Sequence, residues 1–307
     1  MKGTILRGSR NIFTVRFENG ETECRIKGKI LKEAEGCYNP LAPGDVVECE
    51  RGLITGLEKR RNRFARFNQK GQSAQIIAAN VDMVLCVTTP ASPPFRPRFI
   101  DRLLLEADFS GIPAIVICNK YDLVMDDQYG DPDVEERLED YVRIGFQVFR
   151  ISAKTGFGMD DFKNLIKGKT SVISGQSGVG KSTIIKKLIP DAEIKIAAIN
   201  EKYSRGNHTT IQSSLLELPD GETSVIDTPG IRRFAPERLL PEDVIHYMRE
   251  FAPLAGKCSY GLSCFHITEP GCKILEAVNA GAIHEDRYES FIRIRDEMGT
   301  QEYPDND

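Results

Sequence analysis

One short glycine-rich segment limits the folds open to this chain of 307 residues more than any other feature. Residues 175–182 read Gly-Gln-Ser-Gly-Val-Gly-Lys-Ser and match the pattern G-x-x-x-x-G-K-[ST] at every position. A predicted strand at 170–174 precedes them, and a helical pattern that ends before Pro190 follows. A strand, a glycine-rich loop and a helix in this order form a phosphate cradle, because backbone N–H groups and the positive end of the helix face one anion. The segment therefore predicts an α/β domain.

The residues predicted to hold the phosphates are Gly175, Gln176, Ser177, Gly178, Val179, Gly180, Lys181, Ser182 and Thr183. Lys181 would neutralise the β- and γ-phosphate oxygens and is assigned to catalysis, and Ser182 would ligate Mg²⁺.

Two segments further along the chain supply the remaining groups that a nucleotide-bound Mg²⁺ needs. Residues 227–230 have the form D-x-x-G, which places Asp227 near the metal and the N–H group of Gly230 near the γ-phosphate. A polar loop upstream contains Thr209 and Thr210, one of which would complete the metal shell, and the residues do not decide between them.

The base is predicted from residues 119–122, Asn-Lys-Tyr-Asp, which follow the continuous apolar run at 114–118. A carboxylate at Asp122 can accept from both N1–H and N2–H₂ of guanine, and adenine offers no such donor pair. Residues 152–154, Ser-Ala-Lys, follow another strand pattern and look like the element whose Ala N–H group reads guanine O6. The predicted base contacts are Asn119, at the ring edge, Lys120, over the ring face, Tyr121, Asp122, Ser152, Ala153 and Lys154, and the predicted ligands are GTP and GDP.

The order of these motifs is unusual. Ordinary GTPases run from the phosphate loop through the switch threonine and D-x-x-G to N-K-x-D and S-A-K, whereas here N-K-x-D and S-A-K come first. This order indicates a circular permutation, which is physically tolerable because the termini of a domain commonly lie close together.

Residues 1–68 show a different rhythm, with short strand patterns at 13–17, 22–26, 28–31, 45–49 and 53–57 between turn signals. Five short strands predict a small closed β-barrel, either an OB-fold or an SH3-like barrel. The segment carries 14 Lys and Arg against 9 Asp and Glu. Its basic run at 59–66 is predicted to contact RNA phosphates through Lys59, Arg60, Arg61, Arg63 and Arg66, with Phe64 and Phe67 available for stacking.

After residue 236 the strand patterns stop, and helical patterns begin at 241 and run from about 273 to 298. Cys258, Cys264, His266 and Cys272 lie within 15 residues and form a complete Cys₃His set for one structural Zn²⁺ per chain. The predicted domains are therefore a barrel at 1–68, a permuted GTPase domain at 69–235 and a helical zinc domain at 236–307, whose tail from residue 299 is expected to be disordered.

Composition excludes other classes of protein. Hydrophobic residues make up 40% of the chain and charged residues 28%, which fits a globular protein and not a disordered one. No apolar run approaches the roughly 20 residues that span a bilayer, and the N-terminus has no apolar block, so we expect no membrane contact and a cytoplasmic location.

Together, these motifs resemble the RsgA/YjeQ family of circularly permuted GTPases, which act in maturation of the small ribosomal subunit. The resemblance rests on residues 119–122, 175–183, 206–210 and 227–230 and on the Cys/His cluster with residues 269–272, and it covers nearly the whole chain. Two departures are visible. The first zinc spacing is five residues where the family usually has four, which makes Cys258 the least secure ligand, and Asn207 stands where the family often has a basic residue.

The resemblance implies a function as well as a fold. The position after D-x-x-G is Ile231, an aliphatic residue that cannot orient the attacking water. In the family a histidine of the switch loop takes this role, and the resemblance implies that His208 is the corresponding catalytic group. The implied protein is a monomeric GTPase that binds the small ribosomal subunit and its rRNA, and is stimulated by it. Two alternatives stay open: a permuted GTPase acting on the large subunit, and an RNA-binding scaffold with guanine nucleotide as a structural ligand.

Overall fold

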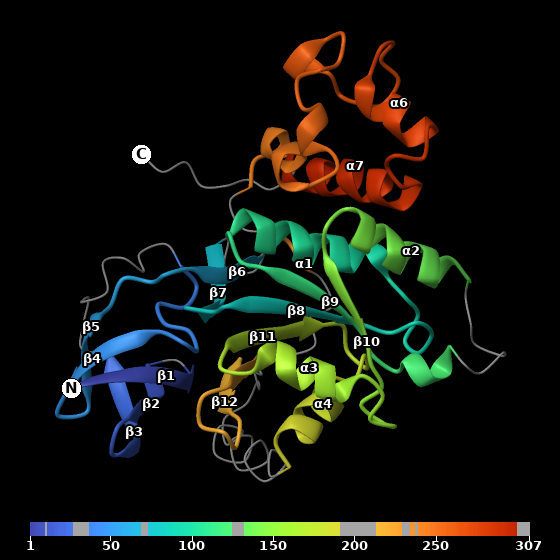
Figure 1. The fold of residues 1–307 in the computed structure, drawn as a ribbon. Coiled ribbons are helices and arrows are strands. Elements are labelled where there is room, and N and C mark those ends of the chain that lie inside the picture. The colour runs from blue at the N-terminus through green and yellow to red at the C-terminus, as the bar shows by residue number, and fades with distance from the viewer. Residues whose placement is uncertain are drawn as a thin grey trace, which may run out of the picture.

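The computed structural model describes residues 1–9, 11–26, 37–68, 73–124, 132–190, 213–228, 234–236 and 239–299. Three parts follow one another along the chain: a β-barrel, an α/β part built on a six-stranded sheet, and a helical C-terminal unit (Figure 1). The strand predicted at 28–31 and the tail at 300–307 lie outside the described residues.

The N-terminal part is a closed barrel with the strand order β1-β2-β3-β5-β4, as expected for an OB-fold. Its strands are β1 (Lys2–Ser9), β2 (Ile12–Phe17), β3 (Gly20–Ile26), β4 (Val46–Glu50) and β5 (Leu53–Leu57). The predicted barrel is confirmed, but β1 was not among the predicted strands. A bulge between Ile5 and Arg7 interrupts the pairing of β1 with β2, and adjacent Ile5 and Leu6 are both buried, so the period-two pattern is lost there.

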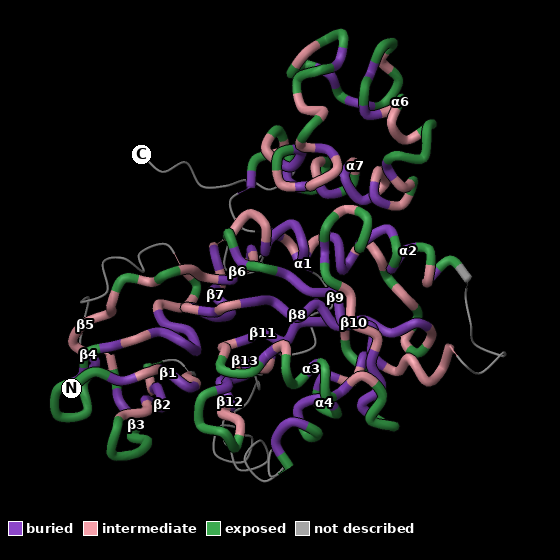
Figure 2. The backbone as a smooth tube through the Cα atoms, in the orientation of Figure 1, coloured by how far each residue is buried: buried purple, intermediate pink, exposed green. Residues whose placement is uncertain are grey.

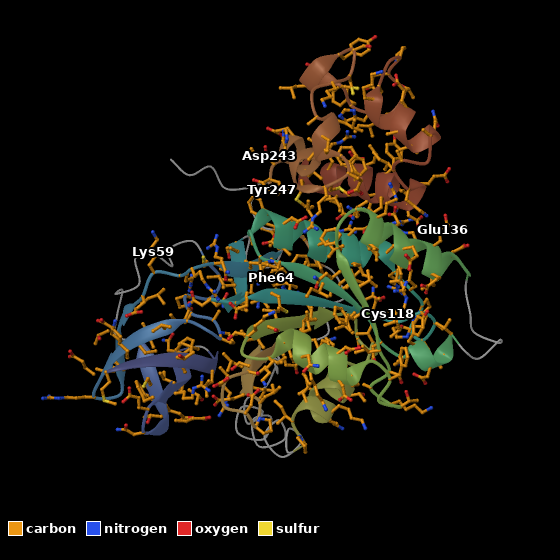
Figure 3. All side chains as sticks on the ribbon, in the orientation of Figure 1. Lys59, Phe64, Cys118, Glu136, Asp243 and Tyr247 are labelled. Atoms are coloured by element: carbon orange, nitrogen blue, oxygen red, sulfur yellow. The ribbon has the colours of Figure 1, made fainter. Side chains whose placement is uncertain are left out.

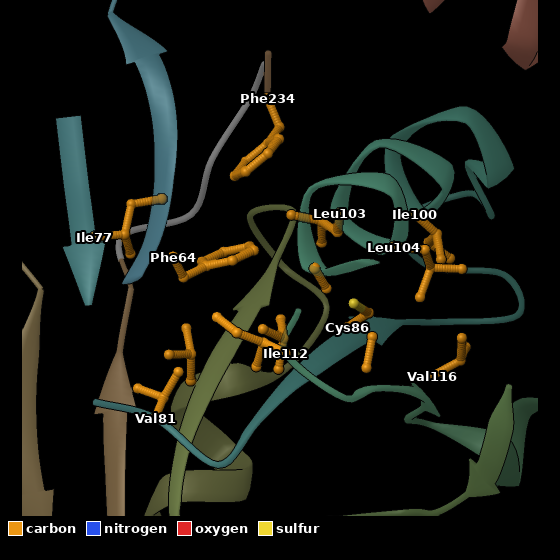
Figure 4. Close-up of a cluster of buried hydrophobic side chains, with 14 of the residues drawn as sticks. Phe64, Ile77, Val81, Cys86, Ile100, Leu103, Leu104, Ile112, Val116 and Phe234 are labelled. Carbon is orange, nitrogen blue, oxygen red and sulfur yellow. The ribbon is translucent and has the colours of Figure 1, made fainter. Parts of the chain in front are cut away.

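A two-stranded hairpin joins the barrel to the α/β part. Strand β6 (Arg63–Asn68) pairs with β7 (Ser73–Ala79) and not with a barrel strand. Phe64 on β6 is fully buried and stacks on Phe234, with ring centroids 5.5 Å apart, next to Leu103 (Figure 4). The inner face of the hairpin is therefore part of the hydrophobic core of the α/β part.

The central sheet has the order β10-β9-β8-β11-β13-β12. Its strands are β8 (Met83–Thr88), β9 (Ala114–Cys118), β10 (Gln147–Arg150), β11 (Thr170–Gly175), β12 (Ser214–Glu217) and β13 (Ser224–Asp227). All pair in parallel except β12, an antiparallel edge strand that no sequence pattern predicted. Every residue of β8 and β9 is buried, which is typical of parallel strands covered on both faces (Figure 2).

Helices cover both faces of this sheet (Figure 1). They are α1 (Pro97–Phe109), α2 (Pro132–Arg143), α3 (Met159–Ile166) and α4 (Lys181–Leu188). One hydrophobic cluster contains the inner residues of α1 and α2, and a second cluster on the other face contains those of α3 and α4. The carboxyl ends of the five parallel strands consequently meet at one edge, where open α/β sheets bind ligands.

The C-terminal unit lies over α1 and α2 (Figure 1). Its helices are the 3₁₀ helices η3 (Pro241–Tyr247), η4 (Ala252–Leu254) and η5 (Gly261–Ser263), and the α-helices α6 (Lys273–Asn279) and α7 (Glu285–Gly299). The helix predicted to open at Pro241 is thus a 3₁₀ helix. Phe251, Ile274, Phe291 and Ile294 form a separate buried core, to which the cysteine cluster belongs.

Candidate nucleotide and metal sites

The glycine-rich loop connects β11 to α4, as predicted. Gly178 and Gly180 have φ angles of +86° and +93°, a region that side chains rarely adopt. A Cβ atom on Gly175 would lie 2.4 Å from the carbonyl oxygen of Val87 in the neighbouring strand. These three glycines let the backbone turn tightly enough for its N–H groups to surround an anion.

Lys181 begins α4 and is only 7% exposed. Its Nζ donates hydrogen bonds to the carbonyl oxygens of Gly175 (2.8 Å) and Gln176 (2.9 Å), so the ammonium lies over its own loop. Burial lowers the pKa of Lys181, and the nearby carboxylate of Asp227 opposes this effect. The cation therefore has few water contacts to lose when phosphate oxygens replace the carbonyls.

Asp227 ends β13 and is paired in register with Ile173 of β11, which brings it beside the glycine-rich loop. Burial raises the pKa of Asp227 to about 6, and the positive charge of Lys181 opposes this shift. The hydroxyl of Ser182 and the carboxylate of Asp227 are hard oxygen donors, which suit Mg²⁺. The predicted residues Thr209, Thr210 and Gly230, and also His208, lie outside the described residues.

Asn119 joins the base-binding loops to the phosphate loop. Its Nδ2 donates to the carbonyl oxygen of Val179 (2.9 Å), and its Oδ1 accepts from the N–H group of Ala153 (3.0 Å). A Cβ atom on Gly180 would lie 2.3 Å from the same Nδ2. These contacts fasten three loops together, and Asn119 is only 1% exposed. The contact of Asn119 with the purine stays a prediction.

Asp122 lies in the short 3₁₀ helix η2 (Tyr121–Leu123) directly after β9. The hydroxyl of Ser152 donates a 2.6 Å hydrogen bond to Asp122 Oδ1 and fixes the carboxylate. This support by Ser152 was missed by sequence reasoning, which assigned Ser152 only as part of the S-A-K element. Lys120 has a φ angle of +59°, and a left-handed conformation in a residue other than glycine is typical of functional positions.

The four predicted zinc ligands come together. The Nδ1 of His266 is 3.6 Å from Cys258 Sγ and 3.4 Å from Cys272 Sγ, and all four ligand atoms lie within 4.8 Å of one another. Zinc bonds of 2.0–2.3 Å separate tetrahedral ligand atoms by about 3.3–3.8 Å, so the set fits this ion. Cys258, the least secure prediction, belongs to the cluster despite its longer spacing.

Two residues that the sequence analysis did not assign hold the cysteine loop in place. The carboxylate of Glu269 accepts from the N–H groups of Phe265, Ile267 and Thr268, and these bonds lower the pKa of Glu269. The hydroxyl of Tyr288 on α7 donates to the His266 carbonyl oxygen at 2.6 Å. Burial lowers the pKa of His266, which favours the neutral imidazole that binds metal.

Comparison with known proteins decides the family. The family model described as RsgA GTPase matches residues 57–237. A Bacteroides fragilis protein named "Small ribosomal subunit biogenesis GTPase RsgA" is 35% identical over 310 residues, which cover 99% of each chain. This chain belongs to the RsgA GTPase family. A protein of the same name from Chlorobaculum parvum is 35% identical and covers 97% of this chain and 98% of its own.

Two solved structures extend the likeness to the fold. The crystal structure of YjeQ from Thermotoga maritima is 28% identical, with a TM-score of 0.71, over 97% of this chain and 98% of that chain. YloQ, titled a circularly permuted GTPase, is 23% identical with a TM-score of 0.68 over 99% of this chain and 96% of its own. The permuted order predicted from the motifs is confirmed, and as an RsgA-family member the protein is a GTP hydrolase.

In this RsgA-family chain, several side chains of the basic run that was predicted to contact RNA also make contacts within the protein. Arg60 is bidentate to buried Asp45, with Nε–Oδ1 and Nη2–Oδ2 distances of 2.7 and 2.8 Å, and its side chain is 12% exposed. Arg61 pairs with Asp82 but is 57% exposed, and Arg66 donates to Gln75. Lys59 is exposed, whereas Phe64 points inward (Figure 3).

The predicted use of Phe64 and Phe67 for base stacking is wrong. Phe64 is 0% and Phe67 7% exposed, because their side of β6 faces the core. A bulge between Phe64 and Ala65 shifts the alternation of β6, so that Phe64 and Phe67, three residues apart, both face the core. Contact with a partner is therefore left to the basic side chains. No helix among the described residues is long and apolar enough to span a bilayer.

Proposed function

We propose that this GTPase binds the small ribosomal subunit, that the subunit stimulates its hydrolysis of GTP to GDP and phosphate, and that the protein assists late maturation of that subunit. The observation that carries the proposal is the match, over 99% of both chains, to a relative named as a small ribosomal subunit biogenesis GTPase. Acting on ribosomal subunits also implies a cytoplasmic location.

The nucleotide would occupy the carboxyl edge of the parallel strands. Lys181 would exchange the carbonyl oxygens of Gly175 and Gln176 for β- and γ-phosphate oxygens, and Asp122 would accept from the guanine edge. Ser182, Asp227 and one of Thr209 and Thr210 would hold the Mg²⁺ that accompanies GTP. Mg²⁺ neutralises charge that develops on the phosphates during transfer.

We assign the positioning of the attacking water to His208. Ile231 occupies the place where Ras-like enzymes carry glutamine, and an aliphatic side chain offers no acceptor to a water molecule. A neutral imidazole can accept a proton from water, which suits the role.

The contact with rRNA would use the outer side of the basic run. Lys59 and Arg61 are the exposed members, whereas Arg60 is engaged by Asp45. Arg63 and Arg66 are half-buried residues of β6 and would extend the contact along the hairpin. We also propose that the protein works as a monomer, which light scattering would test.

Structural zinc would hold the C-terminal unit in shape. The Cys₃His set fills a tetrahedral shell and leaves no position for substrate, so the ion would stabilise the fold and take no part in hydrolysis. His266 has a φ angle of +60°, and this conformation is compensated if the imidazole is tied to a metal.

The deciding experiment measures GTP hydrolysis alone, with purified 30S subunits and with purified 50S subunits, together with cosedimentation. We expect turnover to rise with 30S and not with 50S. Stimulation by 50S alone would instead support action on the large subunit. Absence of turnover under all three conditions would favour the RNA-binding scaffold, with guanine nucleotide as a structural ligand.

A further inference from the structure

The loop after β8 begins between the two halves of the nucleotide site. Strand β8 lies between β9, which leads into the base-binding residues, and β11, which leads into the phosphate loop. The strand order reverses at this point of the sheet. Open α/β sheets form their ligand crevices at such topological switch points. The segment from Thr88 to Pro93 was not assigned to the site by any sequence motif.

This loop contacts the base-binding side twice. The carbonyl oxygen of Thr88 accepts from the N–H group of Asn119 at 2.9 Å. The carbonyl oxygen of Ser92 accepts from Lys120 Nζ at 2.6 Å. The side chain predicted to cover the guanine ring is thus fixed at its charged end by the backbone of this loop.

The same loop also touches the phosphate side. A Cβ atom built on Gly178 would lie 3.5 Å from Cδ of Pro93, which is ordinary contact distance. Gly178 has a φ angle of +86° at the outer turn of the phosphate loop. The proline ring is therefore packed beside the turn that encloses the phosphates.

Thr89 closes the loop on itself. Its hydroxyl donates a 2.6 Å hydrogen bond to the carbonyl oxygen of Pro93, and Thr89 is only 1% exposed. The bond fixes the distance between the end of β8 and Pro93, and with it the position of the adjacent Ser92 carbonyl group. A buried hydroxyl with one defined acceptor specifies a single loop conformation more strongly than apolar contact does.

We propose that Thr89 is a positioning residue for guanine nucleotide binding. It acts through Pro93 and Ser92, which set Lys120 over the base and support the turn at Gly178. This inference rests on the proposed function, because it concerns the same nucleotide site. It adds a residue outside the sequence motifs to the determinants of base binding.

The test compares Thr89→Val, which keeps the shape and removes the hydroxyl, with Thr89→Ser, which keeps the hydroxyl. The readouts are the dissociation rate of GDP, competition by inorganic tripolyphosphate, and the KM and kcat for GTP. We expect Thr89→Val to release GDP about tenfold faster, as expected for one lost buried hydrogen bond. Its KM should rise while kcat stays near wild type, and Thr89→Ser should restore GDP retention. Tripolyphosphate competition should weaken less than GDP binding, because the Pro93 ring is still present beside Gly178.

A matched control is Thr223→Val. Thr223 is also fully buried, and its hydroxyl donates to Asp220 at 2.6 Å, but it lies before β13, at the sheet edge opposite the nucleotide. This variant should lower stability without changing GDP release. Unchanged GDP release in Thr89→Val, or an equal loss of GDP and tripolyphosphate binding, would overturn the positioning role.

A second variant covers the case in which Thr89→Val does not fold. Pro93 is half-buried, and Pro93→Ala removes the ring beside Gly178. We expect faster GDP release and weaker competition by tripolyphosphate, and wild-type values for both would overturn the proposal. Wild-type protein that binds no GDP would overturn the proposed function itself, so the two failures are distinguishable.

Discussion

The Arg287 guanidinium on α7 donates a 2.8 Å hydrogen bond to the Asp101 carboxylate on α1, and the two side chains are 2% and 0% exposed. The hydroxyl groups of Tyr141 on α2 and Ser290 on α7 also donate to Asp101, at 2.7 and 2.5 Å. Arg287 is in turn bidentate to Glu250 at 2.6 and 3.0 Å. A buried polar network thus fastens the cysteine-containing unit to the two helices that cover one face of the GTPase sheet.

Removal of Arg287 should destabilise the whole chain. Arg287→Met leaves Asp101 and Glu250 buried without their shared cation, and breaking such pairs costs about 3–5 kcal/mol of unfolding free energy. Urea unfolding followed by circular dichroism measures the loss. The control is Arg98→Met, whose ion pair with Glu289 is about 40% exposed on both sides and should be worth less than about 1 kcal/mol. Equal effects of the two substitutions would contradict the structural role of Arg287.

Guanine preference should depend on Asp122. Asp122→Asn presents an amide donor toward guanine donors, and such mispairing can cost as much as about 10⁴-fold in selectivity. We expect weaker GTP binding and a gain in binding of xanthosine triphosphate, whose C2 oxygen suits the amide. Competition binding with both nucleotides measures the switch, and unchanged preference would remove Asp122 from base recognition.

The cysteine cluster should carry one zinc per chain. Because formation of a structural zinc site is coupled to folding, chelation should unfold the C-terminal unit. Metal content and thermal unfolding of the Cys264→Ser protein measure this, and both should fall. The control is Cys86→Ser, a buried cysteine of β8 outside the cluster, which should keep its metal. Full metal content in the Cys264→Ser protein would show that the cluster does not bind zinc.

Two adjacent basic residues should behave differently. Arg60→Ala leaves the fully buried carboxylate of Asp45 without its bidentate partner and should cost about 3 kcal/mol of stability. Lys59→Ala, at an exposed position, should keep the stability and weaken rRNA binding, with a smaller dependence on salt. Urea unfolding and filter binding to rRNA at several salt concentrations separate the two effects. Loss of stability in Lys59→Ala alone would reverse the assignment.

The proposed role of His208 predicts that its removal lowers mainly the stimulated rate of GTP hydrolysis. His208→Ala should retain binding of GTP and of small subunits and should have little effect on basal turnover. It should lose most of the stimulated rate, since general-base assistance is typically worth about 10²–10⁴-fold. Hydrolysis with and without 30S subunits measures this, and full stimulation in the variant would show that the histidine takes no part in catalysis.

The sequence by itself determined the chemistry of the sites and the order of the motifs. Each binding element is a short run of neighbouring residues at the end of a strand, such as the phosphate loop after β11 and residues 119–122 after β9. Parallel strands bring those ends to one edge of the sheet, so local patterns suffice to predict the assembled site. The four predicted zinc ligands lie within 15 residues and are equally visible as a local pattern.

Only the tertiary structure decided which polar groups support those sites and which are part of the core. Arg287 and Asp101 are 186 residues apart, and the strands β4 and β5 separate Asp45 from Arg60. No local pattern shows that either pair of charges will be buried together. Phe64 looked available for stacking because its neighbours are basic, yet the hairpin turns it into the core beside Phe234. Side-chain burial depends on which elements pack together, and that packing is a property of the whole folded chain.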